Sequence, residues 1–73
     1  MTNLYKCIGK NGTDYYAIVK NGKKFDLIVV KEDDEGNLEL GKRVIGHGTK
    51  SSHLAAITSN YAIVYEYPAE VLM

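Results

Sequence analysis

Two Asn-Gly dipeptides, Asn11-Gly12 and Asn21-Gly22, stand ten residues apart between segments rich in Tyr, Ile and Val. Asn-Gly is a strong signal for a tight β-hairpin, because a type I′ turn requires positive φ angles that both residues tolerate. Two such turns so close together leave room for short antiparallel strands and for little else. We therefore predict that the chain begins as a β-meander, with strands over residues 4–9, 14–20 and 25–31.

The middle of the chain predicts a fourth strand and a helix. An acidic, glycine-containing turn at residues 33–37 leads into a strand over residues 38–45. Gly41 interrupts that strand and predicts a β-bulge. A short helix is expected near residues 51–59, and it is too short to be stable unless it docks on the sheet.

The ends of this helix and the last strand are predicted from capping residues and alternation. Ser51 or Ser52 offers an N-cap, and Asn60 offers a left-handed terminator. The last strand is predicted over residues 61–67, and one of its faces carries Tyr61, Ile63, Tyr65 and Tyr67.

The predicted order is β-β-β-β-α-β in one small globular domain, residues 1–73, of a mainly β fold. Two architectures fit this order. One is a small five-stranded barrel of the SH3-like sort, and the other is an open antiparallel sheet with one helix across a face. We favour the barrel, because four hairpin-linked strands and a helical turn before the last strand is its usual layout.

Composition narrows the class of protein. The 73 residues carry no net charge, and 25% of them are charged, which is ordinary globular composition. The longest apolar run has five residues against the roughly 20 of a membrane helix, and no signal-peptide core is present. The single cysteine, Cys7, favours a reducing compartment. We expect a cytoplasmic protein that does not enter membranes.

The residues that often carry catalysis or bind metals do not form a recognisable pattern. His47 and His53 are six residues apart, and Cys7 has no second cysteine, so no zinc spacing is present. The acidic turn would place Lys31 at the first ligand position of a calcium loop, and no Gly-x-Ser-x-Gly elbow frames a serine. We expect a non-enzymatic protein without a metal or cofactor.

A glycine-rich stretch before the helix suggests an anion site as one alternative function. Residues 46–52 lead into the predicted helix N-terminus, where free N–H groups and basic side chains favour phosphate or carboxylate. The residues concerned are Gly46, Gly48, Lys50 and Ser51. The stretch is not a Walker A loop, since His47 stands where the lysine is required.

Single-stranded nucleic acid is a second alternative ligand. Five lysines and three tyrosines of the first 24 residues supply phosphate contacts and stacking groups: Lys6, Lys10, Lys20, Lys23 and Lys24, with Tyr5, Tyr15 and Tyr16. The isoelectric point of about 6.7 argues against a dedicated nucleic-acid binder.

Protein–protein contact fits the remaining features best. The chain has six tyrosines, one phenylalanine and no tryptophan. Tyrosine suits a partly solvated contact surface, because its ring is apolar and its hydroxyl is polar. We predict Tyr61, Tyr65 and Tyr67 as apolar anchors and Arg43, His47 and Lys50 as a polar rim. The expected partner is a protein that the domain inhibits or regulates. The small core also raises the expectation of a homodimer.

The neutral total hides an uneven charge layout. Residues 1–24 carry a net charge of +4, residues 25–41 carry −5, and residues 42–73 carry +1. If the fold keeps the first two regions apart, the molecule is dipolar and can orient an approaching partner. If the fold brings them together, the charges cancel locally.

Overall fold

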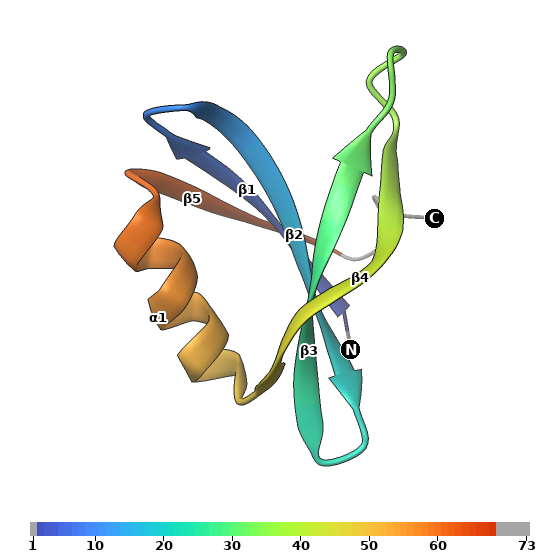
Figure 1. Cartoon of the computed structure of the whole chain (residues 1–73), viewed down its shortest axis with the longest axis vertical. Helices are drawn as coiled ribbons and strands as arrows, with labels where there is room; N and C mark the ends of the chain where they lie inside the picture. Colours follow the sequence, from blue (N-terminus) through green and yellow to red (C-terminus); the bar gives the residue numbers. More distant parts are fainter. Residues whose placement is uncertain (1, 69–73) are drawn as a thin grey trace.

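The computed structural model describes residues 2–68, which form a five-stranded antiparallel sheet with a helix on one face (Figure 1). The strands are β1 (Thr2–Gly9), β2 (Gly12–Asn21), β3 (Lys24–Glu32), β4 (Leu38–Gly48) and β5 (Ile63–Pro68), and the helix is α1 (Lys50–Asn60). The helix lies between β4 and β5 in the chain, so the predicted order of elements is confirmed. Within the described part of the chain, no helix has the length and apolar character needed to cross a membrane.

The sheet is open, so the prediction of a closed barrel is wrong. Its strand order is β4-β3-β2-β1-β5, and within residues 2–68 no further strand pairs with the outer side of β4 or of β5. The reason lies in α1, whose 11 residues span about 16 Å. A helix of this length carries the chain from β4 at one edge to β5 at the other, whereas the predicted barrel needed only a short helical turn there.

Both hairpins form where the Asn-Gly dipeptides predicted them, but each turn is shifted by one residue. Gly9 pairs with Gly12 around the first turn, and Asn21 pairs with Lys24 around the second. Neither asparagine has the positive φ of a type I′ turn, since among the described residues only glycines do. Gly12 takes a φ of 121°, and Gly22, with a φ of 64°, fills the first central position as in a type II′ turn.

β4 is longer than predicted and contains the expected bulge. Its pairing with β3 shifts register on both sides of Ile28, and three residues including Gly41 lie opposite Val29 alone. Beyond the bulge β4 continues to Gly48, and Gly46 and Gly48 pair with Leu27 and Phe25. The glycine-rich stretch over residues 46–52 therefore starts as strand and continues, after Thr49, as the first turn of α1.

The helix begins one residue and ends one residue outside the predicted range. Thr49, rather than Ser51 or Ser52, is the N-cap, and its hydroxyl accepts a hydrogen bond from the Ser52 N–H at 3.1 Å. Asn60 is not left-handed. The chain leaves the helix in an extended conformation at Tyr61, whose N–H donates to the Ile57 carbonyl.

The main core lies between α1 and the sheet. Its buried members are Tyr5, Cys7, Ile18, Leu27 and Ile57, with Leu54 of the helix partly buried beside them. The helix thus packs on the sheet through Ile57 and Leu54, and His53 is buried as well. Burial raises the pKa of Cys7 to about 11, so its thiol stays protonated and behaves as a small apolar side chain.

Candidate protein-binding face

The face of the sheet that points away from α1, which we call the open face, carries two apolar rows. Residues that are register partners on neighbouring strands point to the same face of a sheet. The first row consists of Tyr67, Leu4, Ala17, Ile28 and Val44, and the second of Tyr65, Lys6, Tyr15, Val30 and Leu40. Each row crosses all five strands, and Lys6 is the one charged member. We call the ten residues the apolar platform.

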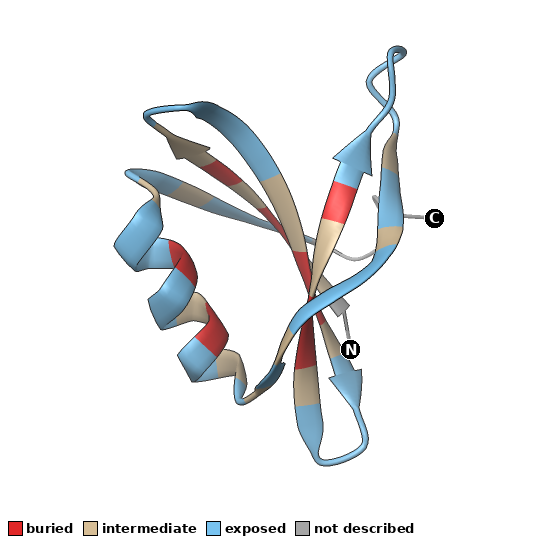
Figure 2. Cartoon of the chain, viewed as in Figure 1, coloured by how far each residue is buried: buried red, intermediate tan, exposed pale blue. Residues whose placement is uncertain are grey.

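The platform is buried at its centre and exposed at both ends. The buried centre consists of Leu4, Ala17 and Val30, which α1 does not touch and which pack with Tyr15, Val19 and Leu38. The exposed ends lie on the edge strands, with 38–47% of each residue accessible: Leu40, Val44, Tyr65 and Tyr67. Figure 2 shows this contrast between the buried central strands and the largely exposed β4 and β5.

Two of the three predicted tyrosine anchors lie on the platform. Tyr65 and Tyr67 stand side by side on β5, with their ring centroids 6.5 Å apart and their planes at 43°. Ile63, which is 45% exposed, continues the same side of the strand. The predicted alternation of these three residues on β5 is therefore present in the structure.

Tyr61 does not share this face, because it precedes β5 and packs on the helix side. Its ring meets Tyr16 edge-on at 6.0 Å, and both belong to the shell of the main core. The Tyr61 hydroxyl donates to Asp14 at 2.6 Å and accepts from Tyr16 at 2.9 Å. Burial, followed by the bonds to Asp14 and Tyr16, raises the pKa of Tyr61 well above its usual value.

A cavity of about 710 Å³ adjoins Tyr61, between the first hairpin turn and the end of α1. Its lining residues include Asp14 and Lys10, which carry opposite charges. These opposite charges do not define one class of ligand. The cavity is on the other side of the sheet from the platform.

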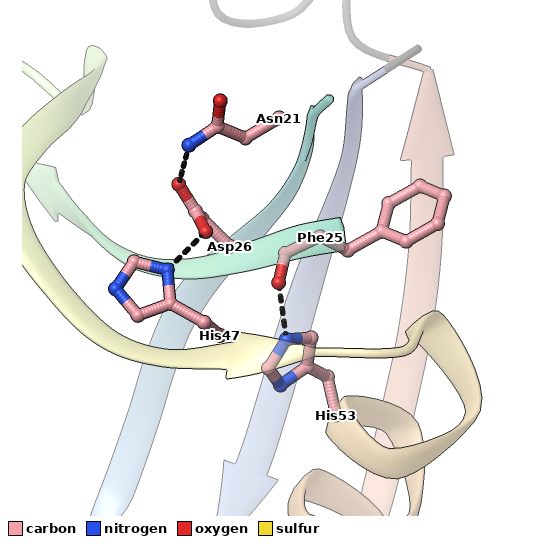
Figure 3. Close-up of polar contacts among 5 residues, drawn as sticks. All are labelled: Asn21, Phe25, Asp26, His47 and His53. Atoms are coloured by element: carbon pink, nitrogen blue, oxygen red, sulfur yellow. Dashed lines mark hydrogen bonds and ion pairs between the residues drawn. The ribbon is translucent and has the colours of Figure 1, made fainter. Parts of the chain in front are cut away.

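The three residues Gly46, His47 and Gly48 of β4 point alternately to the two faces of the sheet. Gly46 and Gly48 face α1, where a Cβ on either would lie within 4 Å of the His53 ring. His53 is 5% exposed, and its Nε2 donates to the Phe25 carbonyl at 2.8 Å (Figure 3). The two glycines therefore leave room for the first turn of α1 to pack on β4.

His47 lies between these glycines and points to the opposite face. Its Nδ1 makes a short hydrogen bond to Asp26 on β3, and the Asn21 amide donates to the other Asp26 oxygen at 3.0 Å (Figure 3). Asp26 is buried, whereas the side chain of His47 is 61% exposed. His47 thus lies beside the Val44 end of the platform, as a rim residue should.

This network predicts a dependence of stability on acidic pH. The hydrogen bonds from His47 and Asn21 hold the pKa of Asp26 below its usual value, which is about 3.9 in an unfolded chain. The ionised carboxylate therefore stabilises the fold above the unfolded pKa, and this contribution is lost as the pH falls through the lower folded pKa. We expect the free energy of unfolding, measured with urea, to fall more steeply below pH 4 in the wild type than in Asp26→Asn.

The pKa of Asp33 is also lowered, chiefly by its hydrogen bond from the Asn37 N–H, but this residue is the same in both proteins. Its effect on the pH profile therefore cancels in the comparison. Parallel pH profiles for the wild type and Asp26→Asn would show that the Asp26 network does not stabilise the fold.

The two remaining rim residues lie apart from Tyr65 and Tyr67. Arg43 is exposed in the bulge of β4, beside a cavity of about 530 Å³ that Lys31, Glu39 and Lys42 also line. Lys50 is the first residue of α1, and its ammonium group is 3.9 Å from Glu66 of β5. The six predicted contact residues are thus distributed over several surfaces rather than one.

The candidate anion loop is largely occupied by secondary structure. Gly46 and Gly48 lie in the β3–β4 ladder, and Ser51 is an exposed residue of the first helical turn. The N-cap bond from Ser52 to Thr49 already uses one of the free N–H groups at the helix start. Anion binding at these residues stays a prediction.

Sequence reasoning missed the exposed end of the platform that lies on β4. Leu40 and Val44 are four residues apart in the chain, yet the bulge places them in neighbouring rows on the open face. Alternation of side chains along β4 does not reveal that the bulge has two residues more than the facing part of β3. The glycine at position 41 was the available signal, and it indicated a bulge without giving its size.

Among residues 2–68, no group of three His, Cys, Asp or Glu side chains is arranged to hold a metal ion. No protein-family model matches the chain, and comparison with curated proteins and with solved structures gives no significant match. The class of protein is thus defined by its fold, a mainly β open sheet with one helix, and by the platform on its open face.

Proposed function

We propose that this protein is a non-enzymatic binding module that engages a protein partner through the apolar platform, as an inhibitor or regulator of a larger protein does. The observation that carries the proposal is the pair of apolar rows across all five strands, with exposed side chains at both ends. Exposed apolar groups gathered on one face are typical of protein interaction sites.

The chemistry of the platform supports a protein partner. Tyr65 and Tyr67 each offer a large apolar ring and a hydroxyl group, which is the combination enriched among residues that dominate binding energy. The centre of the platform is packed inside the fold, so the exposed rings project from a well-supported surface. A supported surface lowers the entropic cost of binding.

The positions of the other tyrosines favour this proposal over nucleic-acid binding. Tyr5 is 1% exposed, and the ring and hydroxyl of Tyr16 are engaged with Tyr61 on the helix side. Of the three tyrosines available for base stacking in the sequence, only Tyr15 lies on the open face, where it is half-buried. A continuous stacking surface beside the lysines is therefore not formed by these residues.

The test is a pull-down from cell lysate, with the wild type and with Tyr65→Ser/Tyr67→Ser as bait. The affinity of each bait for the captured protein is then compared. Ile45→Ser is the matched control, because Ile45 is equally exposed at 50% but lies on the helix side beside Ile57. We expect the double variant to lose at least about tenfold in affinity for the captured protein, since the two exposed aromatic anchors of the platform are removed. The control should bind as the wild type does.

Circular dichroism of all three proteins establishes that each is folded before capture is compared. Equal capture of the same protein by the wild type and the double variant would overturn the proposal. So would binding of single-stranded oligonucleotides with a steep salt dependence together with no captured protein, because that behaviour defines a nucleic-acid binder.

A further inference from the structure

The two ends of β3 carry opposite charge. Its first end adjoins the β2–β3 turn, where the exposed cations are Lys20, Lys23 and Lys24, and we call this group the basic end. Its second end adjoins the β3–β4 turn, where the exposed carboxylates are Glu32, Asp33, Asp34 and Glu35, and we call this group the acidic end. Figure 1 shows the two turns at opposite ends of the long axis.

The distance between the two ends prevents them from neutralising each other. The nine residues of β3 span about 30 Å at roughly 3.3 Å per residue. That length is several times the screening distance of about 8 Å at physiological salt. The fold therefore keeps the charged regions apart, and the neutral protein is a dipole directed along β3.

We infer that, when no larger partner is bound, the apolar platform is covered by a second copy of this chain, packed face to face with its β3 strand antiparallel to the first. This inference rests on the proposed function, because it names the occupant of the same platform. A two-fold axis in the plane of the interface and perpendicular to β3 brings each acidic end against the basic end of the other copy. The interface is then self-complementary, as a two-fold dimer requires.

Charge decides between the possible two-fold arrangements. An axis parallel to β3 would also stack the two platforms, but it would place the acidic ends together and the basic ends together. Like charges brought together at an interface disfavour that arrangement. The antiparallel arrangement instead places each basic end against an acidic end. The same rotation places β5 of one copy over β5 of the other, so Tyr65 and Tyr67 meet their counterparts.

The accessible part of the platform supports only a weak dimer. Leu4, Ala17 and Val30 at its centre are at most 4% exposed, so the surface that a second copy covers comes from the platform residues on the two edge strands. Such an interface lies below the roughly 1,000 Å² of a stable one, and the pairing of opposite charges at the two ends of β3 adds to it. A dimer of this size is expected to dissociate on dilution.

A charge exchange between the two ends tests the arrangement. Lys23→Glu/Lys24→Glu changes the basic end from a net charge of +3 to −1, so both ends of β3 are acidic. Glu32→Lys/Asp34→Lys/Glu35→Lys changes the acidic end from −4 to +2, so both ends are basic. Asp33 is left unchanged, because its carboxylate accepts hydrogen bonds from the N–H groups of Glu35 and Asn37 within the turn. In the antiparallel dimer, each variant alone places like charges at both contacts, whereas a mixed dimer of the two pairs opposite charges at both.

The measurement is sedimentation equilibrium over a range of protein concentrations at low and high salt. We expect a monomer–dimer equilibrium for the wild type, weakened by salt, and a dissociation constant at least about tenfold higher for either charge variant alone. An equimolar mixture of the two variants should recover a dissociation constant close to that of the wild type. Tyr65→Ser/Tyr67→Ser should be monomeric, and Ile45→Ser should dimerise like the wild type.

Three results would overturn the inference: a monomeric wild type at all concentrations, a mixture that dimerises no better than its components, or species that grow beyond the dimer. The last result would indicate open head-to-tail stacking instead of a closed pair. If the wild type is monomeric but still captures another protein through Tyr65 and Tyr67, the inference fails and the proposed function stands. If that capture is absent too, both fail.

Discussion

Gly41→Ala is expected to lower the free energy of unfolding by about 2–3 kcal/mol, the upper part of the range for overpacking. A Cβ at position 41 would lie 2.5 Å from the carbonyl oxygen of Val29. That atom belongs to the backbone of the neighbouring strand, so it cannot move aside as the end of a flexible side chain can. The bulge of β4 depends on this close approach of two backbones.

Gly46→Ala is the matched control on the same strand. Its Cβ would meet nothing closer than the His53 ring at 3.8 Å, which is ordinary contact. We expect a change within about 1 kcal/mol, because alanine also restricts the unfolded chain. Urea denaturation of both variants measures the difference, and equal losses at the two positions would contradict the proposed steric cause.

The second large effect is expected at Tyr61. Tyr61→Ala should destabilise the fold by about 2–3 kcal/mol, because the ring packs on Tyr16 and the hydroxyl is bonded to Asp14. Tyr65→Ala should cost less than about 1 kcal/mol, because Tyr65 is 47% exposed at a sheet edge. Thermal and urea denaturation of the two variants give the comparison.

Tyr61→Phe separates packing from hydrogen bonding, because it keeps the ring and removes the donor to Asp14. We expect this variant to lose about 1 kcal/mol, a typical value for one hydrogen bond. If Tyr65→Ala were as costly as Tyr61→Ala, Tyr65 would be part of the core, and its role as a binding anchor would have to be abandoned.

The contrast between Tyr61 and Tyr65 shows what alternation in a sequence cannot reveal. Both residues fit one face of a strand over residues 61–67, but alternation applies only after the strand has begun. The structure ends α1 at Asn60 and begins β5 at Ile63, so Tyr61 lies in the connection and turns toward the helix. The point at which β5 joins β1 is set by tertiary pairing, which local pattern does not contain.

The Asn-Gly dipeptides predicted the hairpins because the information needed for a tight turn is local. The placement of Gly46 and Gly48 is not local, since it depends on Leu27 and Phe25 of another strand and on His53 of the helix. Without these partners, glycines in a row indicate a loop. The choice between an open sheet and a barrel failed for the same reason, because it depends on where the helix carries the chain.

The strand that bears Tyr65 and Tyr67 is also the last to be made. β5 pairs with β1, and this ladder joins Asn3 to Pro68, whereas the other three ladders connect strands that follow one another in the chain. Closing so long a loop costs more entropy than closing a hairpin, so the meander is expected to form before β5 docks. During synthesis the emerging chain would thus present a folded meander with an unfinished edge, and the tyrosine side of its binding surface would be completed only when translation has passed β5.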